Sequence, residues 1–387
     1  MRILVGVHEG GFNGIDTYAE QVAAALDANG ADVTLLTANR DVAIQSSSRL
    51  EGTKVQIIDM DLPIPGRGTE TAQRLWHGVR MHRLSNAIHN VLSRHNQHFD
   101  VIHLNHPGLS ESVHAWGRVI VTAAWFYPHS FTGRIKETWK HTRGNIFRRL
   151  IINAKSTAFF LSDNSGYHKS DLVVCPTRTL ADQLLSQGIH AEICPPPVRV
   201  TASVSNITET SFSDLHQLLV CCGDLSHPRK NVMDALLAAG MLPPDMGKVR
   251  LMLVGGNSDY LKKQARLLPD HIEAVFPGKL PPVELHELMR KSSALLMPSL
   301  YEEWGYVAVE SLLCGTPVVS YPVYPFQDML ASGLGTIAEK VSAQSLSEAI
   351  QKQLKSGKKG ELYEKALEKY SSINIGSCWV YRKISQY

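Results

Sequence analysis

The fold is decided by residues 297–320, "MPSLYEEWGYVAVESLLCGTPVVS". The stretch begins as an apolar strand, and Gly305 then precedes a segment over 306–313 with the apolar spacing of a helix. Gly315 ends that helix, because glycine readily takes the left-handed conformation that closes a helix, and a second apolar strand follows. A strand, a helix and a strand in this order predict one unit of a parallel sheet.

Two acids lie on either side of the expected helix start. Glu302 precedes Gly305 in the loop, and Glu310 lies inside the helix. A helix N-terminus binds phosphate readily, and a glycine there allows close approach. Their spacing in the chain puts the carboxylates on the order of 10 Å apart, too far for the roughly 5 Å pair of a retaining glycosidase. Carboxylates so placed can instead hold the two ends of an elongated ligand, such as a nucleotide sugar, through its vicinal hydroxyls.

The same alternation of strands and helices runs along most of the chain. Strands are expected at 3–8, 32–38, 101–104, 119–124, 172–176, 217–222, 250–254, near 275, 294–297 and 317–320, and helices at 15–26, 75–92, 179–187, 231–239, 259–267, 282–291 and 306–313. The segment 195–212 is rich in Pro, Ser and Thr without periodicity, and we predict a linker there. The predicted fold class is α/β, with two doubly wound, Rossmann-like domains, residues 1–200 and 213–369, facing a central cleft.

Composition excludes several classes of protein. The chain has 387 residues, enough for two cores, and its 44% apolar and 19% charged content is globular. No apolar run reaches the roughly eighteen residues of a membrane span, and residues 1–7 are too short for a signal peptide. The six cysteines lack zinc or redox spacing, and a net charge of +3 does not favour nucleic acid. A cytoplasmic protein is expected.

The pattern E-x-W-G, with a second acid eight positions after the first and then "CGTPVV", resembles the E-x7-E signature of the retaining GT-B-fold glycosyltransferases of family 4. The resemblance implies that Glu302 contacts the donor sugar and that Glu310 holds the ribose. It also implies further donor contacts, from Gly223, Lys279, Leu280, Trp304, Gly305 and Tyr306. On the same ground, a helix over 370–387 is expected to join the first domain.

The segment 221–231, "CCGDLSHPRKN", places two cations, Arg229 and Lys230, just before a helix. Cations there oppose the helix dipole, which indicates that they face an anion, although a solvated surface pair is the alternative. The segment resembles the family's diphosphate clamp, so Lys230 and Arg229 are predicted to stabilise the leaving nucleotide. Asp224 stands where the family has arginine. Either Asp224 turns away from the diphosphate, or Arg229 supplies the missing charge.

The loop after the first strand, "HEGGFNG", suits close approach of a phosphate or sugar at Gly10 and Gly11. A dinucleotide-binding motif would need glycine at Glu9 and an acid after the second strand, so a dehydrogenase is disfavoured. In the resembled family, the corresponding loop faces the donor from the first domain.

Histidines follow the expected strands of the first domain. His103 and His106 lie at the end of one strand, whereas the histidine that the family has after the next strand is Ala124 here, with His129 five residues later. His103, His106 and His129 are therefore candidates for acceptor binding or catalysis. Each can equally be a structural, hydrogen-bonded ring.

Two other stretches of the sequence carry clustered charge. Asp59 and Asp61 form a D-x-D pattern, but they are expected in a loop without supporting ligands, so no metal site is predicted. Residues 134–155 carry seven cations against one acid. This stretch is either a peripheral contact with the cytoplasmic face of an anionic membrane or a solvated helix.

The function predicted from sequence is retaining, metal-independent transfer of a hexose from a nucleotide-diphosphate sugar, with UDP-glucose as the assumed donor. The acceptor would be a hydroxyl of a carbohydrate or lipid-linked molecule in polysaccharide or glycolipid assembly, and no separate cofactor is expected. Two alternatives remain open. One is a UDP-sugar epimerase or hydrolase on the same fold, and the other is a non-catalytic subunit that binds nucleotide sugar.

Overall fold

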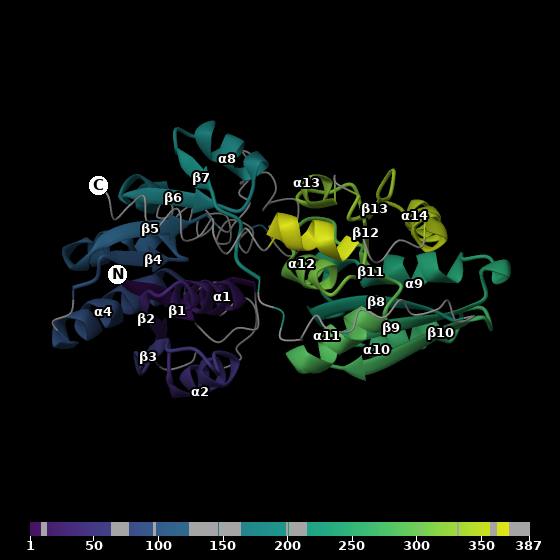
Figure 1. The fold of residues 1–387 in the computed structure, drawn as a ribbon, viewed down its shortest axis with the longest axis horizontal. Coiled ribbons are helices and arrows are strands. Elements are labelled where there is room, and N and C mark those ends of the chain that lie inside the picture. Colours follow the sequence, from purple (N-terminus) through teal and green to yellow (C-terminus); the bar gives the residue numbers. More distant parts are fainter. Residues whose placement is uncertain are drawn as a thin grey trace. The chain divides into compact units, whose positions relative to one another are not determined.

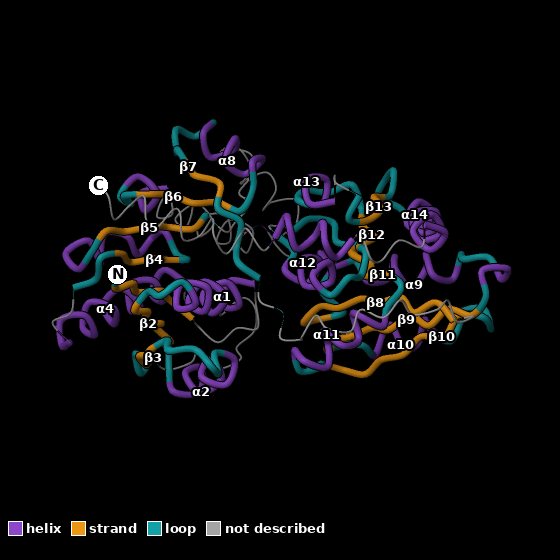
Figure 2. The backbone as a smooth tube through the Cα atoms, in the orientation of Figure 1, coloured by secondary structure: helices purple, strands orange, loops and turns teal. Residues whose placement is uncertain are grey.

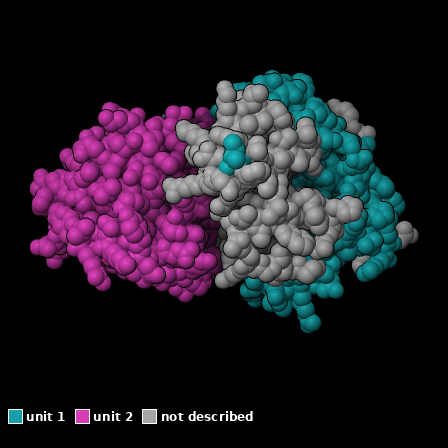
Figure 3. Space-filling model, turned by 180° about the vertical axis from the view of Figure 1, so that it is seen from behind, with its two compact units in different colours: residues 1–197, 373–387 teal, residues 198–372 magenta. Residues whose placement is uncertain are grey.

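The structure, a computed structural model, describes residues 1–8, 14–62, 77–95, 98–123, 146, 164–198, 200, 215–302, 304–330, 333–356 and 362–370. The chain divides into two compact units, which are coloured separately in Figure 3. Unit 1 comprises residues 1–197 and 373–387, and unit 2 comprises residues 198–372. The division falls inside the predicted linker 195–212, most of which lies outside the described residues. The helix expected over 370–387 also lies outside them, apart from its first residue.

Unit 1 is built on a parallel sheet with the order β3-β2-β1-β4-β5-β6-β7 (Figure 1). Its described strands are β1 (Arg2–His8), β2 (Asp32–Thr37), β3 (Gln56–Asp59), β4 (Val101–Leu104), β5 (Arg118–Thr122), β6 (Leu172–Cys175) and β7 (Ala191–Ile193). Its described α-helices are α1 (Gly14–Ala28), α2 (Arg40–Arg49), α4 (His77–His95), α5 (Ser110–Val113) and α8 (Arg178–Leu185), and a further helical segment covers 164–168. Every residue of β4 is buried, as expected for a parallel strand covered on both faces.

Unit 2 repeats the plan with a second parallel sheet. Its strand order is β10-β9-β8-β11-β12-β13, and the strands are drawn in orange in Figure 2. Its strands are β8 (Leu215–Asp224), β9 (Lys248–Gly256), β10 (Ile272–Gly278), β11 (Ala294–Met297), β12 (Val318–Ser320) and β13 (Gly335–Ile337). Its α-helices are α9 (Val232–Gly240), α10 (Asp259–Ala265), α11 (Pro282–Lys291), α12 (Tyr306–Leu313), α13 (Phe326–Leu330) and α14 (Ala343–Ser356). A further helical segment covers 362–370. One core cluster joins the strands to α9 and α14 through Leu236, Leu253, Leu296 and Ile350.

The strand order reverses at the same place in both sheets. The first strand of each unit has the second strand on one side and the fourth strand on the other, so the reversal falls between β1 and β4 in unit 1 and between β8 and β11 in unit 2. Loops at the carboxyl ends of such a strand pair leave in opposite directions and create the usual ligand site of an open α/β sheet. In unit 2 this place is occupied by the predicted clamp and the loop that carries Glu302.

The α/β fold class with two doubly wound sheets is confirmed, and four predicted elements have the observed bounds: β4, α11, β11 and α12. The prediction of a loop at 59–61 was wrong at its first residue, because Asp59 ends strand β3. Elements that were not predicted include α2, β7, α13, β13 and α14. Within the described part of the chain, no helix combines the length and apolar character that crossing a membrane requires.

Candidate active site

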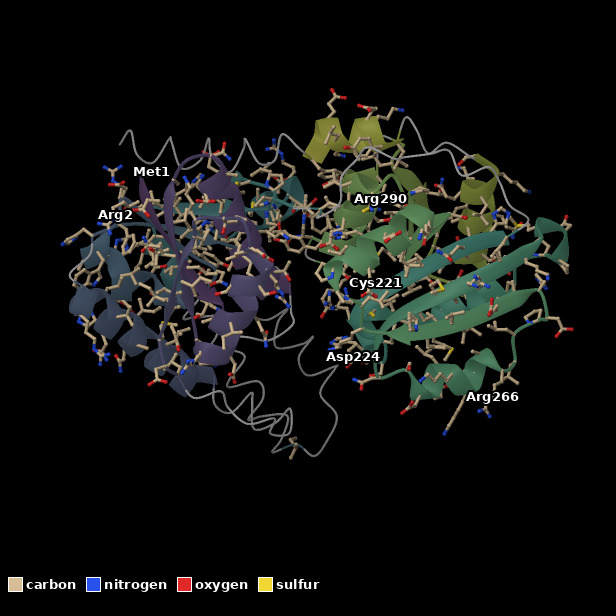
Figure 4. All side chains as sticks on the ribbon, turned by 60° about the horizontal axis from the view of Figure 1, so that its bottom comes forward. Met1, Arg2, Cys221, Asp224, Arg266 and Arg290 are labelled. Carbon is tan, nitrogen blue, oxygen red and sulfur yellow. The ribbon has the colours of Figure 1, made fainter. Side chains whose placement is uncertain are left out.

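The candidate site lies at the carboxyl ends of β8 and β11. Strand β8 leads into a short 3-10 turn, Pro228–Lys230, and β11 leads into the loop that contains Glu302. The two loops are joined directly, since the Leu300 amide donates to the Arg229 carbonyl at 2.9 Å. Figure 4 shows Cys221 and Asp224 near this end of β8.

Glu302 is held by three side chains. Glu302 is only 5% exposed. Its carboxylate accepts one hydrogen bond from Arg229 Nη1 at 2.8 Å and another from Lys230 Nζ. The Ser299 hydroxyl donates to the same carboxylate at 2.8 Å. The anion that the two cations were predicted to face is therefore, in this structure, the first acid of the motif itself.

Tyr301 fixes the Arg229 side chain from a second direction. The Arg229 guanidinium lies over the Tyr301 ring, 5.2 Å from its centroid, and also donates to the Tyr301 carbonyl at 3.3 Å. A planar guanidinium suits stacking and hydrogen bonding at the same time. Arg229 is therefore oriented towards Glu302 rather than left as a mobile surface cation.

The electrostatics of Glu302 favour its ionised form. Burial on its own raises the pKa of this carboxyl, but Lys230 and Arg229, with the hydrogen bonds from Lys230 and Ser299, outweigh burial and hold the pKa below its usual value. Glu302 is thus a buried carboxylate whose charge depends on two neighbouring cations. If another anion drew both cations away, the buried Glu302 carboxylate would lose its compensating charges, and keeping it ionised would cost free energy.

The structure shows where Asp224 points. Its Oδ1 accepts hydrogen bonds from the Ser226 amide at 2.8 Å and the Ser226 hydroxyl at 2.7 Å. Burial on its own raises the pKa of Asp224. Hydrogen bonds from Ser226 and Asn257 lower this pKa by more than burial raises it, so the pKa is below its usual value. Of the two alternatives for this position, the geometry agrees with the first, because the carboxylate is engaged by Ser226 in its own loop and by Asn257 in the loop after β9.

Gly305 begins α12 in a conformation that favours glycine. It is the N-cap residue with φ 84° and ψ 59°, in the left-handed region. A Cβ at this position would also meet the Phe326 ring at 3.0 Å. Gly315 has φ 76° just past the end of the helix, as predicted for its closing residue. Backbone geometry and the contact with Phe326 therefore both favour glycine at position 305. The absence of a side chain also allows an anion to approach the start of α12 closely.

Glu310 lies on α12 beside strand β8. Burial raises the pKa of its carboxyl to about 7. Cys221 is its neighbour: burial raises the pKa of the Cys221 thiol, and the charge of Glu310 raises it further. Glu310 therefore changes charge near neutral pH, unlike Glu302.

The remaining predicted donor residues of unit 2 lie around these loops. Trp304 is buried, its Nε1 has no hydrogen-bond partner in the described part of the chain, and its ring meets Tyr370 edge-on at 6.3 Å. Tyr306, the first residue of α12, is partly buried. The others are Gly223, exposed near the end of β8, Lys279, exposed just after β10, and Leu280, which is partly exposed. Their contacts with a donor stay a prediction.

In unit 1, His103 belongs to a buried hydrogen-bonded group. Its Nε2 lies 2.5 Å from the Thr122 hydroxyl and 3.3 Å from the Tyr18 hydroxyl, and these two hydroxyls are 2.7 Å apart. Burial lowers the pKa of His103 to about 3, so the ring is neutral. This environment is that of a structural histidine, whereas His106, at the end of β4, is partly exposed.

Several predicted features lie outside the described residues. They are the donor loop residues Gly10 and Gly11, the position Ala124, His129, and nearly all of the basic stretch 134–155.

Two contributors to the site were not predicted. Ser299 bonds Glu302 directly, and Tyr301 stacks on Arg229. The signal for Ser299 was its position three residues before a buried acid in a strand-to-helix loop, where a hydroxyl commonly bonds within the loop. No pattern in the sequence indicated the stacking of Tyr301.

Comparison with known proteins identifies the class. Residues 13–198 match the family model described as glycosyl transferase 4-like domain, and residues 210–370 match the model described as glycosyl transferases group 1. The two matches together with the two doubly wound sheets identify a glycosyltransferase of the GT-B fold. The chain belongs to glycosyltransferase family 4, as the motif between Glu302 and Glu310 predicted.

Individual relatives are distant. Phosphatidyl-myo-inositol mannosyltransferase of Mycobacterium leprae is 24% identical over 87% of this chain and 82% of its own length. Alpha-monoglucosyldiacylglycerol synthase of Streptococcus pneumoniae is 25% identical over 40% of this chain and 38% of its own.

Similar solved structures cover the whole chain. WaaG, a glycosyltransferase involved in lipopolysaccharide biosynthesis, has a TM-score of 0.68 at 18% identity and covers 99% of both chains. Sucrose-phosphate synthase of Thermosynechococcus elongatus has a TM-score of 0.68 at 16% identity, over 99% of this chain and 98% of its own. At these identities the likeness shows the fold alone.

Proposed function

We propose that the protein transfers a hexose, with glucose as the first candidate, from a nucleotide-diphosphate sugar to an acceptor hydroxyl, with retention at the anomeric carbon. UDP-glucose is the first candidate donor. The observation that carries the proposal is the buried Glu302 carboxylate between Arg229 and Lys230, at the carboxyl ends of β8 and β11. A site of this kind has an anion-binding pair of cations and a sugar-binding acid within a few ångströms of each other.

The roles of the side chains follow from their charges. Arg229, Lys230 and the amides at the start of α12 would bind the diphosphate and stabilise the charge that develops on it as the bond to the sugar breaks. Glu302, released from part of its pairing by the diphosphate, would accept hydrogen bonds from the sugar hydroxyls. Glu310, when ionised, would accept them from the ribose diol.

The chemical step needs no side-chain base in this proposal. The acceptor oxygen forms a bond to the anomeric carbon on the face from which the diphosphate departs, and the departing phosphate oxygen takes the acceptor proton. Two fixed cations next to the leaving group supply the positive charge that the departing nucleotide requires, so we propose that the reaction is independent of metal. The neutral, buried His103 fits a supporting rather than a proton-accepting role.

We propose a lipid-linked or carbohydrate acceptor, in glycolipid or polysaccharide assembly at the cytoplasmic face of a membrane. The support comes from the relatives, whose names refer to transfer onto phosphatidyl-myo-inositol and to synthesis of a glucosylated diacylglycerol. The basic stretch 134–155 is the proposed peripheral contact with anionic lipid.

The test is a panel of UDP-, GDP- and ADP-sugars, each incubated with and without anionic vesicles that contain phosphatidylinositol and diacylglycerol. Nucleotide release that depends on the acceptor, with an α-configured glycolipid by NMR, supports the proposal. Epimer formation without acceptor would support an epimerase, and nucleotide release to water a hydrolase. Binding without turnover of any donor would overturn transfer in favour of a binding subunit, and loss of turnover in EDTA would overturn independence of metal.

A further inference from the structure

Asn231, the residue after Lys230, has an uncommon backbone conformation. It lies between the 3-10 turn Pro228–Lys230 and α9, with φ 48° and ψ 39°. This left-handed region costs energy for most L-residues, and asparagine is among the few side chains found there regularly. The direction in which the chain presents Lys230 to Glu302 therefore depends on a residue whose backbone needs support.

Asp234 supplies this support through its side chain. Asn231 Nδ2 donates to Asp234 Oδ2 at 2.7 Å, and the Asp234 amide donates back to the Asn231 carbonyl at 3.0 Å. The N-cap side chain of α9 thus bonds the acid of the first turn instead of the free amides that an N-cap usually satisfies. This exchange ties the left-handed residue to the helix that follows it.

Tyr321 holds Asp234 in turn. Its hydroxyl donates to the same Oδ2 at 2.7 Å, and its side chain is fully buried directly after β12. Burial, with the hydrogen bond to Asp234, raises the pKa of the Tyr321 hydroxyl, so it remains a donor at neutral pH. The path from Tyr321 through Asp234 and Asn231 to Lys230 connects the sheet of unit 2 with the candidate diphosphate site.

We propose that Asp234 and Tyr321 are positioning residues for sugar transfer: they hold Asn231 in the left-handed conformation and thereby keep the Lys230 ammonium at Glu302 and at the diphosphate of the donor. This inference rests on the proposed function. Neither residue touches the reacting atoms, and both act through the backbone of Asn231. A glycine at position 231 would take the same conformation without help, since it has no Cβ.

The test is a double-mutant cycle between positions 231 and 234. Asp234→Ala should lower kcat/KM for the donor by about 10- to 100-fold, because a small displacement of a catalytic cation has a large effect on rate. In the Asn231→Gly background, Asp234→Ala should lower kcat/KM for the donor by less than about threefold. A role of Asp234 confined to stability would lower the Tm and leave the kcat of the folded protein unchanged in both backgrounds. Equal losses of kcat/KM in the two backgrounds would overturn the proposal.

Two further variants complete the design. Tyr321→Phe keeps the packed ring and removes only the donor, so it should lower kcat/KM by about three- to tenfold, with the loss again absent in the Asn231→Gly background. Asp259→Ala is the matched control, because Asp259 is also the acid in the first turn of a helix, α10, and is exposed. A loss with Asp259→Ala as large as that with Asp234→Ala would count against a specific role.

The outcome can be separated from the proposed function. Failure of the unmodified protein to turn over any nucleotide sugar would refute the proposed function. The positioning role of Asp234 would then be tested by crystal structures of the Asp234→Ala variant and of the Asp234→Ala, Asn231→Gly double variant. Lys230 displaced from Glu302 in the first and restored in the second would support it, and Lys230 unmoved in the first would overturn it.

Discussion

Lys230 donates a hydrogen bond to Glu302 although the two residues are 72 positions apart in the chain. They meet because β8 and β11 are neighbours in the sheet, so the loops that follow these strands lie side by side at its carboxyl edge. The contact joins the predicted clamp and the predicted acid motif into one site. It also means that a diphosphate bound by Lys230 and Arg229 must compete with Glu302 for both cations.

Glu302→Gln should separate binding from turnover. Glutamine keeps one acceptor oxygen but loses the negative charge and replaces the second acceptor oxygen with an NH2 donor, so turnover should fall on the order of 1,000-fold. UDP should bind at least as tightly as before, because Arg229 and Lys230 no longer pair with an anion. Initial rates and calorimetric titration with UDP measure the two effects. Glu284→Gln, on the exposed face of α11, is the control, and unchanged turnover in Glu302→Gln would refute the assigned role.

Lys230→Ala and Arg229→Ala should each weaken UDP binding by about 10- to 100-fold, the value of one or two charge-assisted hydrogen bonds. Each variant also leaves Glu302 with a single neighbouring cation, so the free energy of unfolding of the variant protein should fall modestly. Titration with UDP at two salt concentrations measures the change, and Lys340→Ala, an exposed lysine, is the comparison. UDP affinity that survives both substitutions would place the diphosphate elsewhere.

Glu310 should make donor binding depend on pH near neutrality. Its pKa of about 7 means that the ionised form, which accepts bonds from a ribose diol, becomes dominant only as the pH rises through 7. The KM for the donor should therefore fall between about pH 6 and 8 in the unmodified protein and stay level in Glu310→Gln. A KM with the same pH dependence in both proteins would assign the titration to another group.

The same carboxyl should affect stability in a defined direction. Since its pKa is raised from 4.5 in the folded protein, the folded state binds the proton more tightly than the unfolded state. The Glu310 contribution to the free energy of unfolding is then largest below pH 4.5 and is lost as the pH rises to about 7, by about 3 kcal/mol. Denaturant titrations of the protein and of Glu310→Gln at several pH values give this difference, and parallel curves would contradict it.

His103 should show the opposite dependence. Its pKa is lowered to about 3 from 6.5, so on acidification the unfolded chain takes up a proton that the folded protein refuses. Its stabilising contribution is present above pH 6.5 and is lost by about 1.4 kcal/mol per pH unit as the pH falls below that value. His103→Gln, whose amide can still bond Thr122, should remove this slope. A larger effect on kcat than on stability would instead favour a catalytic role.

Gly305→Ala should destabilise unit 2 by about 1–3 kcal/mol through its positive φ and the Phe326 ring. Gly333→Ala is a matched control, because Gly333 has φ 79° with no heavy atom within 4 Å of the added methyl group. The difference between the two in denaturant titrations isolates the Phe326 contact. Equal destabilisation would show that the contact contributes nothing.

Much of unit 2 was predictable because its signals are local. Gly305 and Gly315 bound an apolar helix, and the strand before it is a continuous buried run, so α12 and the loop position of Glu302 followed directly. By contrast, α2 has only Val42 and Ser46 buried, which gives almost no periodic signal. The edge strand β3 is four residues long and lacks a fully buried residue, so it resembled a loop.

The pairing within the site could not be read from the sequence. The position of Arg229 and Lys230 just before a helix indicated that they face an anion, but which anion they face depends on the order of strands in the sheet. The position of Asp224 was likewise left open, since the choice was made by Ser226 and Asn257, a contact between two loops. Sequence patterns report what a segment prefers, whereas these contacts depend on tertiary placement.

The group of Arg229, Lys230 and Glu302 carries two positive charges and one negative charge. A nucleoside diphosphate that has given up its sugar keeps the negative charge that the two cations attract, while Glu302, no longer occupied by sugar hydroxyls, again competes for these cations. The spent nucleotide should therefore compete with fresh donor and inhibit the reaction, and the renewed pairing of Glu302 with Arg229 and Lys230 is expected to assist its release.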